Sequence, residues 1–291
     1  MILIDGKKIA SSIRNEIKDK VEQIKLAENL SPCLATILVG DNPASQTYIN
    51  SKIKACQSCG IQSVHHNLKA DAPKEEIISL IEELNKNSAI DAILLQLPFA
   101  DSSIEQECTN AITPAKDADG IHPFNAGFLT LLKSQKEISQ KNILAACTPL
   151  GIIRLLQKSN IEIAGKKAVV VGRSNLVGKP LSLLLLANDA TVIMTHSKTK
   201  NLKEICKSAD ILIAALGRAK FINKDFIKDG AAVIDVGINR TEQGLVGDVD
   251  FESVKDMNIQ ITPVPGGVGP MTIAMLLENT LKAFIKNKRI L

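Results

Sequence analysis

The chain has 291 residues, of which 45% are apolar, and 35 basic against 31 acidic residues give it a formal net charge of +4. This length is near twice that of a typical domain, so we expect two domains with sizeable cores. One tyrosine, no tryptophan and no basic stripe interleaved with aromatic residues leave few platforms for base stacking, so we expect no nucleic-acid partner. The absence of an apolar leader or of an uninterrupted apolar stretch of eighteen residues predicts no membrane partner and a cytoplasmic protein.

The first half alternates short β-type runs with amphipathic helical patterns, which indicates parallel α/β units. The predicted elements are, in chain order, strand 34–40, helix 45–59, strand 64–68, helix 73–86 and strand 92–98. Cys56 and Cys59 form the one close cysteine pair, and nothing downstream completes a zinc site. We therefore expect buried, reduced cysteines and no metal.

The second half carries a Rossmann-like series after the polar segment 134–142, which we predict to be a linker. Apolar residues at helical spacing from Ile273 to Ile285 then predict a final amphipathic helix. The predicted elements of the series are helix 149–158, strand 167–172, helix 179–188 and strands 191–196, 210–216 and 231–237.

Glycine and proline are concentrated in PVPGGVGPMT at 263–272, just before that final helix. Glycine lets a backbone approach a ligand closely and proline fixes φ, so such a loop can form a rigid binding surface. A tight interdomain turn explains the same residues, because both residue types mark turns more often than sites.

The strand 167–172 runs into GRSNLVGKP, where a strand, a glycine turn and a helix start follow one another. A Rossmann domain sets pyrophosphate at this place, although the spacing is not G-x-G-x-x-G and an ordinary βα turn fits equally well. The next strand ends in Thr195-His196-Ser197-Lys198, without the carboxylate that an NAD site usually has. Arg173 and Ser197 can instead meet a 2′-phosphate, so NADP is the better fit.

Four further residues are candidates for binding or catalysis, and each also has a purely structural explanation. Tyr48 and Lys52 are four residues apart on a predicted helix and so share a face, as many exposed pairs do. Gln96 lies toward the carboxyl end of the strand 92–98, where a satisfied polar residue is equally expected. Asp119 precedes Gly120, which by itself indicates a turn.

Taken together, six blocks resemble the bifunctional methylenetetrahydrofolate dehydrogenase/cyclohydrolase family and follow the order found there. They are YINSK at 48–52, QLP at 96–98, KDADG at 116–120, GRSNLVGKP at 172–180, DVGINR at 235–240 and the loop at 263–272. The resemblance implies a folate-binding catalytic domain (1–144 plus 273–291), which the C-terminal helix completes, and a Rossmann-like NADP-binding domain (145–272). It also implies a homodimer.

The resemblance assigns roles to individual residues. It implies catalysis by Lys52, Tyr48 and Gln96, folate binding by Tyr48, Asp119, Pro265, Gly266 and Gly267, and cofactor binding by Gly172, Arg173, Ser174, Ser197 and Ile238. Departures from the family pattern are alanines at 100, 146 and 219, where proline is common, and none falls on an implied catalytic residue.

The implied reaction is NADP-dependent oxidation of 5,10-methylenetetrahydrofolate followed by hydrolysis of the 5,10-methenyl product to 10-formyltetrahydrofolate. Burial and a nearby cation would both favour a neutral Lys52 amine, which can then act as a base or proton shuttle. Two alternatives remain open: a dehydrogenase without the hydrolytic step, and a non-catalytic NADP-binding sensor.

Overall fold

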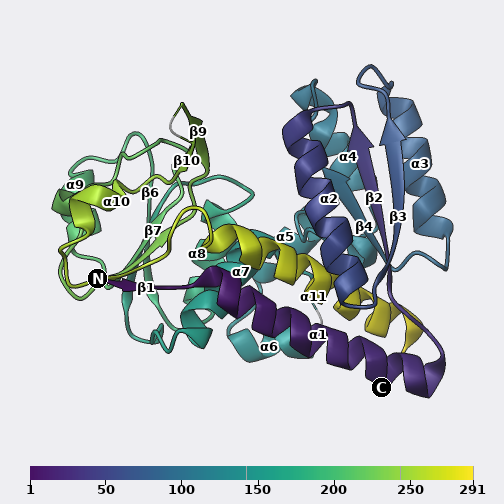
Figure 1. Cartoon of the computed structure of the whole chain (residues 1–291), viewed down its shortest axis with the longest axis horizontal. Coiled ribbons are helices and arrows are strands. Elements are labelled where there is room, and N and C mark those ends of the chain that lie inside the picture. The colour runs from purple at the N-terminus through teal and green to yellow at the C-terminus, as the bar shows by residue number, and fades with distance from the viewer. Residues whose placement is uncertain (142, 243, 291) are drawn as a thin grey trace. The chain divides into compact units, whose positions relative to one another are not determined.

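The computed structural model describes residues 1–141, 143–242 and 244–290, and it divides into two compact units (Figure 1). The six-stranded unit comprises Met1–Ser11, Leu129–Lys141 and Ala146–Thr272. The three-stranded unit comprises Ser12–Phe128, Asn142–Ala145 and Ile273–Leu291. None of the helices in the described ranges combines the length and apolar character that crossing a membrane requires.

The six-stranded unit is built on one parallel sheet with the strand order β1-β11-β8-β7-β5-β6. This confirms the Rossmann-like arrangement, and the predicted strands lie within two residues of the observed ends. The strands are β1 (Ile2–Leu3), β5 (Lys167–Val171), β6 (Thr191–Thr195), β7 (Ile211–Ala214), β8 (Ala232–Asp235) and β11 (Gln260–Ile261), with a separate antiparallel hairpin of β9 (Asn239–Thr241) and β10 (Gly244–Val246).

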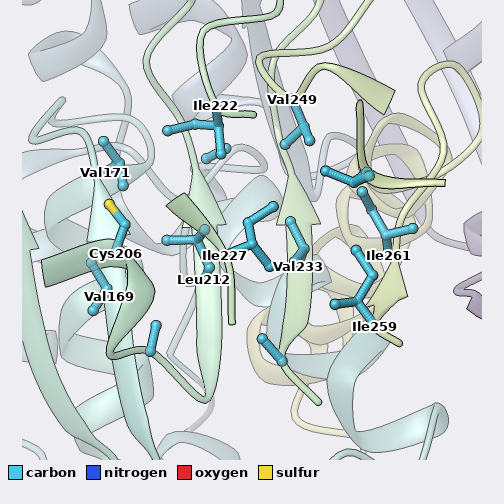
Figure 2. Close-up of a cluster of buried hydrophobic side chains, with 14 residues drawn as sticks. Val169, Val171, Cys206, Leu212, Ile222, Ile227, Val233, Val249, Ile259 and Ile261 are labelled. Atoms are coloured by element: carbon cyan, nitrogen blue, oxygen red, sulfur yellow. The ribbon is translucent and has the colours of Figure 1, made fainter. Parts of the chain in front are cut away.

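Apolar side chains on one face of this sheet form a core. Figure 2 shows Val169, Leu212, Val233 and Ile261 from four neighbouring strands in this cluster, all of them fully buried. Strands covered on both faces read as continuous apolar runs, which is why the pattern predicted them well. The helices of this unit are α6 (Gln135–Gln140), α7 (Cys147–Lys158), α8 (Gly178–Leu186), α9 (Leu202–Lys207) and α10 (Phe251–Val254), with a short 3-10 turn, η3 (Lys224–Phe226).

The three-stranded unit has the parallel order β3 (Gln62–Leu68), β2 (Cys33–Val39) and β4 (Ala92–Gln96). Alternate residues of β2 pack against Ile77, Ile81 and Leu84 of α3 (Lys74–Lys86) and against α4 (Glu105–Ala111). All residues of β2 and β4 are buried, whereas β3 is an edge strand with exposed side chains. The unit also contains α2 (Pro43–Ser58), most of α5 (Pro123–Leu129), η1 (Ser102–Ile104) and η2 (Pro114–Lys116).

Two long helices continue from one unit into the other, α1 (Gly6–Glu28) and α11 (Val268–Lys288). The later part of α11 belongs to the three-stranded unit, where the Asn279 amide donates to the carbonyls of Ala118 (3.0 Å) and Ala145 (2.9 Å). Near the end of α11 the Asn287 amide donates to the carbonyl of Asp91 at 3.3 Å. The C-terminal helix therefore completes the first α/β domain, as the resemblance implied.

Two details differ from the sequence-based expectations. The segment 134–142 is wrong as a linker in its described part, because Gln135–Gln140 form α6 and the Gln135 N–H donates to the Ala187 carbonyl at 2.8 Å; Asn142 lies outside the described residues. Residues 1–11 lie with the six-stranded unit, because the N–H of Ile4 donates to the Ile261 carbonyl at 2.8 Å. The assignment of folate binding and catalysis to 1–144 plus 273–291, and of NADP binding to 145–272, stays a prediction.

Candidate active site

The three-stranded unit joins Lys52 and Gln96, two polar side chains that are buried in the chain's interior. Lys52 is 7% exposed on α2, and Gln96, the last residue of β4, is 9% exposed. The Lys52 ammonium Nζ donates to Gln96 Oε1 at 2.9 Å, while Gln96 Nε2 donates to the Leu97 carbonyl at 2.6 Å. The second bond fixes which way the amide faces, so its oxygen is held toward the lysine. Lysine side chains are seldom buried, which marks this one as a candidate functional group.

Tyr48 lies one turn before Lys52 on α2. Its side chain is 45% exposed, and its neighbour Ile49 is buried. Residues four apart on a helix share a face, so the tyrosine ring is on the side of α2 from which Lys52 projects. Its exposed aromatic surface is suited to stacking against a flat ligand.

Asp119 lies in a loop that a neighbouring carboxylate organises. Asp117 is 1% exposed and accepts N–H bonds from Gly120 (3.0 Å) and His122 (2.8 Å) and from the Asn125 amide (2.9 Å). Burial raises the pKa of Asp117 despite these donors. The sequence analysis did not assign Asp117 a role in this loop. Its position three residues before a glycine is nevertheless typical of a side chain that closes a turn.

The same loop runs beside β4. Asp117 pairs with Ile93 in a parallel bridge, and the Ala118 N–H donates to the Ile93 carbonyl at 3.1 Å. Since both segments run in the same direction, the chain carries Asp119 toward the carboxyl end of β4, where Gln96 lies. The three-stranded unit thus brings Tyr48, Lys52, Gln96 and Asp119 to one region of its sheet.

In the six-stranded unit the turn between β5 and α8 can be formed only by glycine at two positions. Gly172 has φ +137°, and a Cβ added to it would lie 2.2 Å from the Ala215 carbonyl oxygen. A Cβ added to Gly178 would lie 2.3 Å from the carbonyl oxygen of Gly172. We call this closely packed glycine turn between β5 and α8 (172–178) the glycine cradle, and it lies at the place in the fold where a Rossmann domain sets a dinucleotide pyrophosphate. Ser174 has a local role there, since its Oγ accepts the N–H of Val177 at 3.2 Å.

The cofactor residues predicted for the 2′-phosphate follow neighbouring strands. The Gly172 N–H donates to the Thr195 carbonyl at 3.0 Å, which ties the glycine turn to the end of β6. Arg173 and Ser197 come next after these two ends, and both are exposed. From Thr191 to Lys203 the chain has no carboxylate. A cation and a hydroxyl that follow adjacent strands suit a phosphate better than a ribose 2′-OH.

The remaining predicted residues lie at the same edge of the six-stranded sheet. Ile238 follows β8 and is 50% exposed. Pro265, Gly266 and Gly267 follow β11, and the Gly266 carbonyl accepts the N–H of Lys7 at 3.0 Å. Open α/β sheets bind ligands outside the carboxyl ends of their strands, and all predicted residues of this unit are there.

Comparison with known proteins identifies the family. Residues 4–119 match the family model of the tetrahydrofolate dehydrogenase/cyclohydrolase catalytic domain, and residues 146–288 match that of its NAD(P)-binding domain. The chain belongs to the tetrahydrofolate dehydrogenase/cyclohydrolase family. The two matched ranges place Lys52 and Gln96 in the part that the family model calls catalytic.

Individual members of the family are similar over the full length. The bifunctional protein FolD of Campylobacter hominis is 51% identical over 284 residues, which is 97% of each chain. The solved bifunctional FolD enzyme of Campylobacter jejuni is 45% identical, covers all of both chains and has a TM-score of 0.90. The Trypanosoma brucei FolD solved with NADP cofactor and an inhibitor is 36% identical over 99% of each chain, with a TM-score of 0.90.

Proposed function

We propose that this chain oxidises 5,10-methylenetetrahydrofolate with NADP and hydrolyses the 5,10-methenyl product to 10-formyltetrahydrofolate. The observation that carries the proposal is the buried Lys52–Gln96 hydrogen bond within the catalytic-domain match. The glycine cradle at 172–178 within the NAD(P)-binding match supports the use of NADP as the cofactor. Relatives at about half identity over nearly the whole chain are named bifunctional proteins.

The residues of the three-stranded unit divide the work between binding and proton movement. Tyr48 stacks on the aromatic part of the folate, and Asp119 accepts N–H donors from its pterin-like ring. NADP, when bound, accepts the hydride that leaves the methylene carbon. Water then adds to the resulting methenyl carbon and loses a proton, and one carbon–nitrogen bond of the ring opens to leave the formyl group. Lys52, oriented by Gln96, takes that proton from the water and returns it to the ring nitrogen that departs, while the remaining hydroxyl proton passes to solvent as the formyl carbonyl forms.

The direct test is to assay the unaltered protein for both steps. Incubation with methylenetetrahydrofolate and NADP is expected to produce reduced cofactor, and methenyltetrahydrofolate supplied alone is expected to be hydrolysed. Oxidation without hydrolysis would leave a dehydrogenase lacking the second activity. Binding of NADP with neither reaction would indicate a sensor.

The cofactor preference is tested at Arg173. The unaltered protein is expected to use NADP with a higher kcat/KM than NAD, because Arg173 and Ser197 meet the 2′-phosphate. Arg173→Ala is expected to reduce kcat/KM for NADP by about tenfold or more, the scale of one charge-assisted hydrogen bond, and to leave NAD use unchanged. Lys207→Ala, which removes another exposed cation of the same unit, on α9, is the matched control. Better use of NAD by the unaltered protein would refute the assignment.

A homodimer is part of the proposal, and the edge strand β3 supports it. Parallel strands are normally covered on both faces, yet Val64 is 40% exposed and His65 is exposed as well. Sedimentation equilibrium is expected to give twice the chain mass of 31.3 kDa. Val64→Lys is expected to weaken association, and Leu245→Lys, at a similarly exposed site in the other unit, to leave it intact. A monomeric unaltered protein would contradict the dimer.

The cellular setting completes the proposal. A 10-formyl product is a donor of one-carbon units, so we place the enzyme in the one-carbon metabolism that feeds purine biosynthesis, in the cytoplasm.

A further inference from the structure

The carboxylate of Asp248 is fully buried and accepts four N–H bonds. Its Oδ2 accepts the backbone N–H groups of Leu216 (2.6 Å) and Gly217 (2.9 Å), and its Oδ1 accepts that of Arg218 (2.8 Å). The Asn239 side-chain amide donates to Oδ1 as well, at 3.0 Å. Three consecutive backbone N–H groups that converge on one point form an anion-binding nest. Here the protein's own carboxylate fills that nest.

A second buried carboxylate holds Asp248 in place. Asp235, the last residue of β8, accepts the N–H groups of Gly237 (3.0 Å) and Asp248 (2.9 Å) at Oδ1 and that of Val249 (2.9 Å) at Oδ2. Burial raises the pKa of Asp235 to about 6. A Cβ added to Gly237 would lie 2.2 Å from Asp248 Oδ1, and one added to Gly247 would lie 1.8 Å from Asp235 Oδ2. Each carboxylate therefore occupies space that a glycine leaves open.

These bonds fix two loops at the carboxyl edge of the six-stranded sheet, the loop after β7 (215–218) and the loop after β8 (236–239). Figure 2 shows Val249, next to Asp248, and Ile222 beyond the arrowheads of the strands that carry Leu212 and Val233. The Ile222 N–H donates to the Asp248 carbonyl at 2.9 Å, which holds the segment in that position.

The loop after β7 also adjoins the glycine cradle. The Ala215 N–H donates to the Val171 carbonyl at 2.9 Å, and the Ala215 carbonyl oxygen limits residue 172 to glycine. In a dinucleotide-binding sheet the two halves of the cofactor lie over the strands on either side of the first βα turn. Since Arg173 and Ser197 are on the β5–β6 side, the loops that Asp248 holds are on the side of the nicotinamide half.

We propose that Asp248 is a positioning residue for the nicotinamide half of NADP. Its carboxylate holds the loops after β7 and β8 in their binding conformation before the cofactor arrives. These loops therefore lose little conformational entropy when NADP binds. Because the Asp248 carboxylate already fills the nest at 216–218, the pyrophosphate binds at residues 172–174 of the glycine cradle instead. The inference rests on the proposed function in one respect, that NADP is the ligand of this unit.

Asp248→Asn tests the role, because the amide has one acceptor oxygen in place of two and cannot satisfy all the donors. Calorimetric titration with NADP alone is expected to show a Kd raised by at least about tenfold, as for a buried donor left unpaired. The ratio of NADP to NAD affinity and the cyclohydrolase rate are expected to stay within about twofold. Asp250→Asn, two residues on and partly exposed, is the matched control and should change neither. An unchanged Kd, or equal loss of both activities, would overturn the proposal.

Hydrogen exchange on the unaltered protein tests the same idea without a variant. The amides of 216–218 are expected to be protected without NADP and to gain little protection when NADP is added. Amides that exchange freely and become protected only with NADP would show that the cofactor, not Asp248, orders the loop. If the unaltered protein binds NADP but oxidises no methylenetetrahydrofolate, the proposed function fails while both readouts of Asp248 remain valid.

Discussion

Replacing Lys52 with Gln is expected to reduce the cyclohydrolase rate by about 10²- to 10⁴-fold and to leave measurable dehydrogenase activity. Hydride transfer mainly requires two rings to be held face to face, whereas attack of water on the methenyl carbon also requires proton movement. The Gln side chain can still donate to Gln96 Oε1, the present partner of Lys52 Nζ at 2.9 Å, but it cannot take up a proton. Both activities are to be measured on one folded preparation.

Lys54→Gln is the matched control, because Lys54 is exposed and lies two residues further along α2. It should alter neither activity. Equal loss of the two activities in the Lys52 variant would make Lys52 a general binding residue, and undiminished hydrolysis would remove it from the proton transfer.

The reverse separation of activities is expected for Gly172→Ala. The added Cβ would lie 2.2 Å from a backbone oxygen, and alanine would have to adopt φ +137°. Overpacking and backbone strain are expected to shift the turn out of its present conformation, and restoring that conformation when NADP binds costs about 3 kcal/mol, which corresponds to about a 100-fold loss of kcat/KM with NADP. The cyclohydrolase rate is expected to persist, because Lys52 and Gln96 belong to the other unit.

Gly165→Ala is the control for Gly172→Ala, because it introduces backbone strain at a positive φ without a steric collision of the added Cβ. Gly165 has φ +73°, and an added Cβ would meet no heavy atom of the described residues within 4 Å. This variant should retain NADP binding. If Gly172→Ala bound NADP as tightly as the unaltered protein, the cradle would not be the pyrophosphate site.

Strands were predictable where their apolar pattern is continuous, whereas the longest helix, α1 (Gly6–Glu28), was not among the predicted elements. The strands 34–40 and 167–172 were found within a residue of β2 and β5, because buried parallel strands are continuous apolar runs. The two-residue strands β1 and β11 are too short for any periodicity, and they were missed. The helix α6 was mistaken for a linker because its six residues are mostly polar.

The candidate site was predictable residue by residue but not as a set of contacts. Lys52 and Gln96 are 44 residues apart, and only the pairing of β2 with β4 and the packing of α2 bring them together. Asp235 and Asp248 were overlooked for a different reason. Each stands next to or near a glycine, a pattern that indicates an ordinary turn, and only the three-dimensional arrangement shows which N–H groups their carboxylates accept.

Because α1 and α11 each continue from one unit into the other, the gene cannot be cut into two fragments that each encode one unit. Each unit is made of three separate stretches of chain, and two of the boundaries between units fall inside the two longest helices, at residues 11–12 and 272–273. No single contiguous fragment therefore encodes a complete unit, and a truncation at either point would cut a helix between two turns. Recombinant expression of one half alone is expected to yield insoluble protein, and the two activities have to be separated by substitution rather than by cloning.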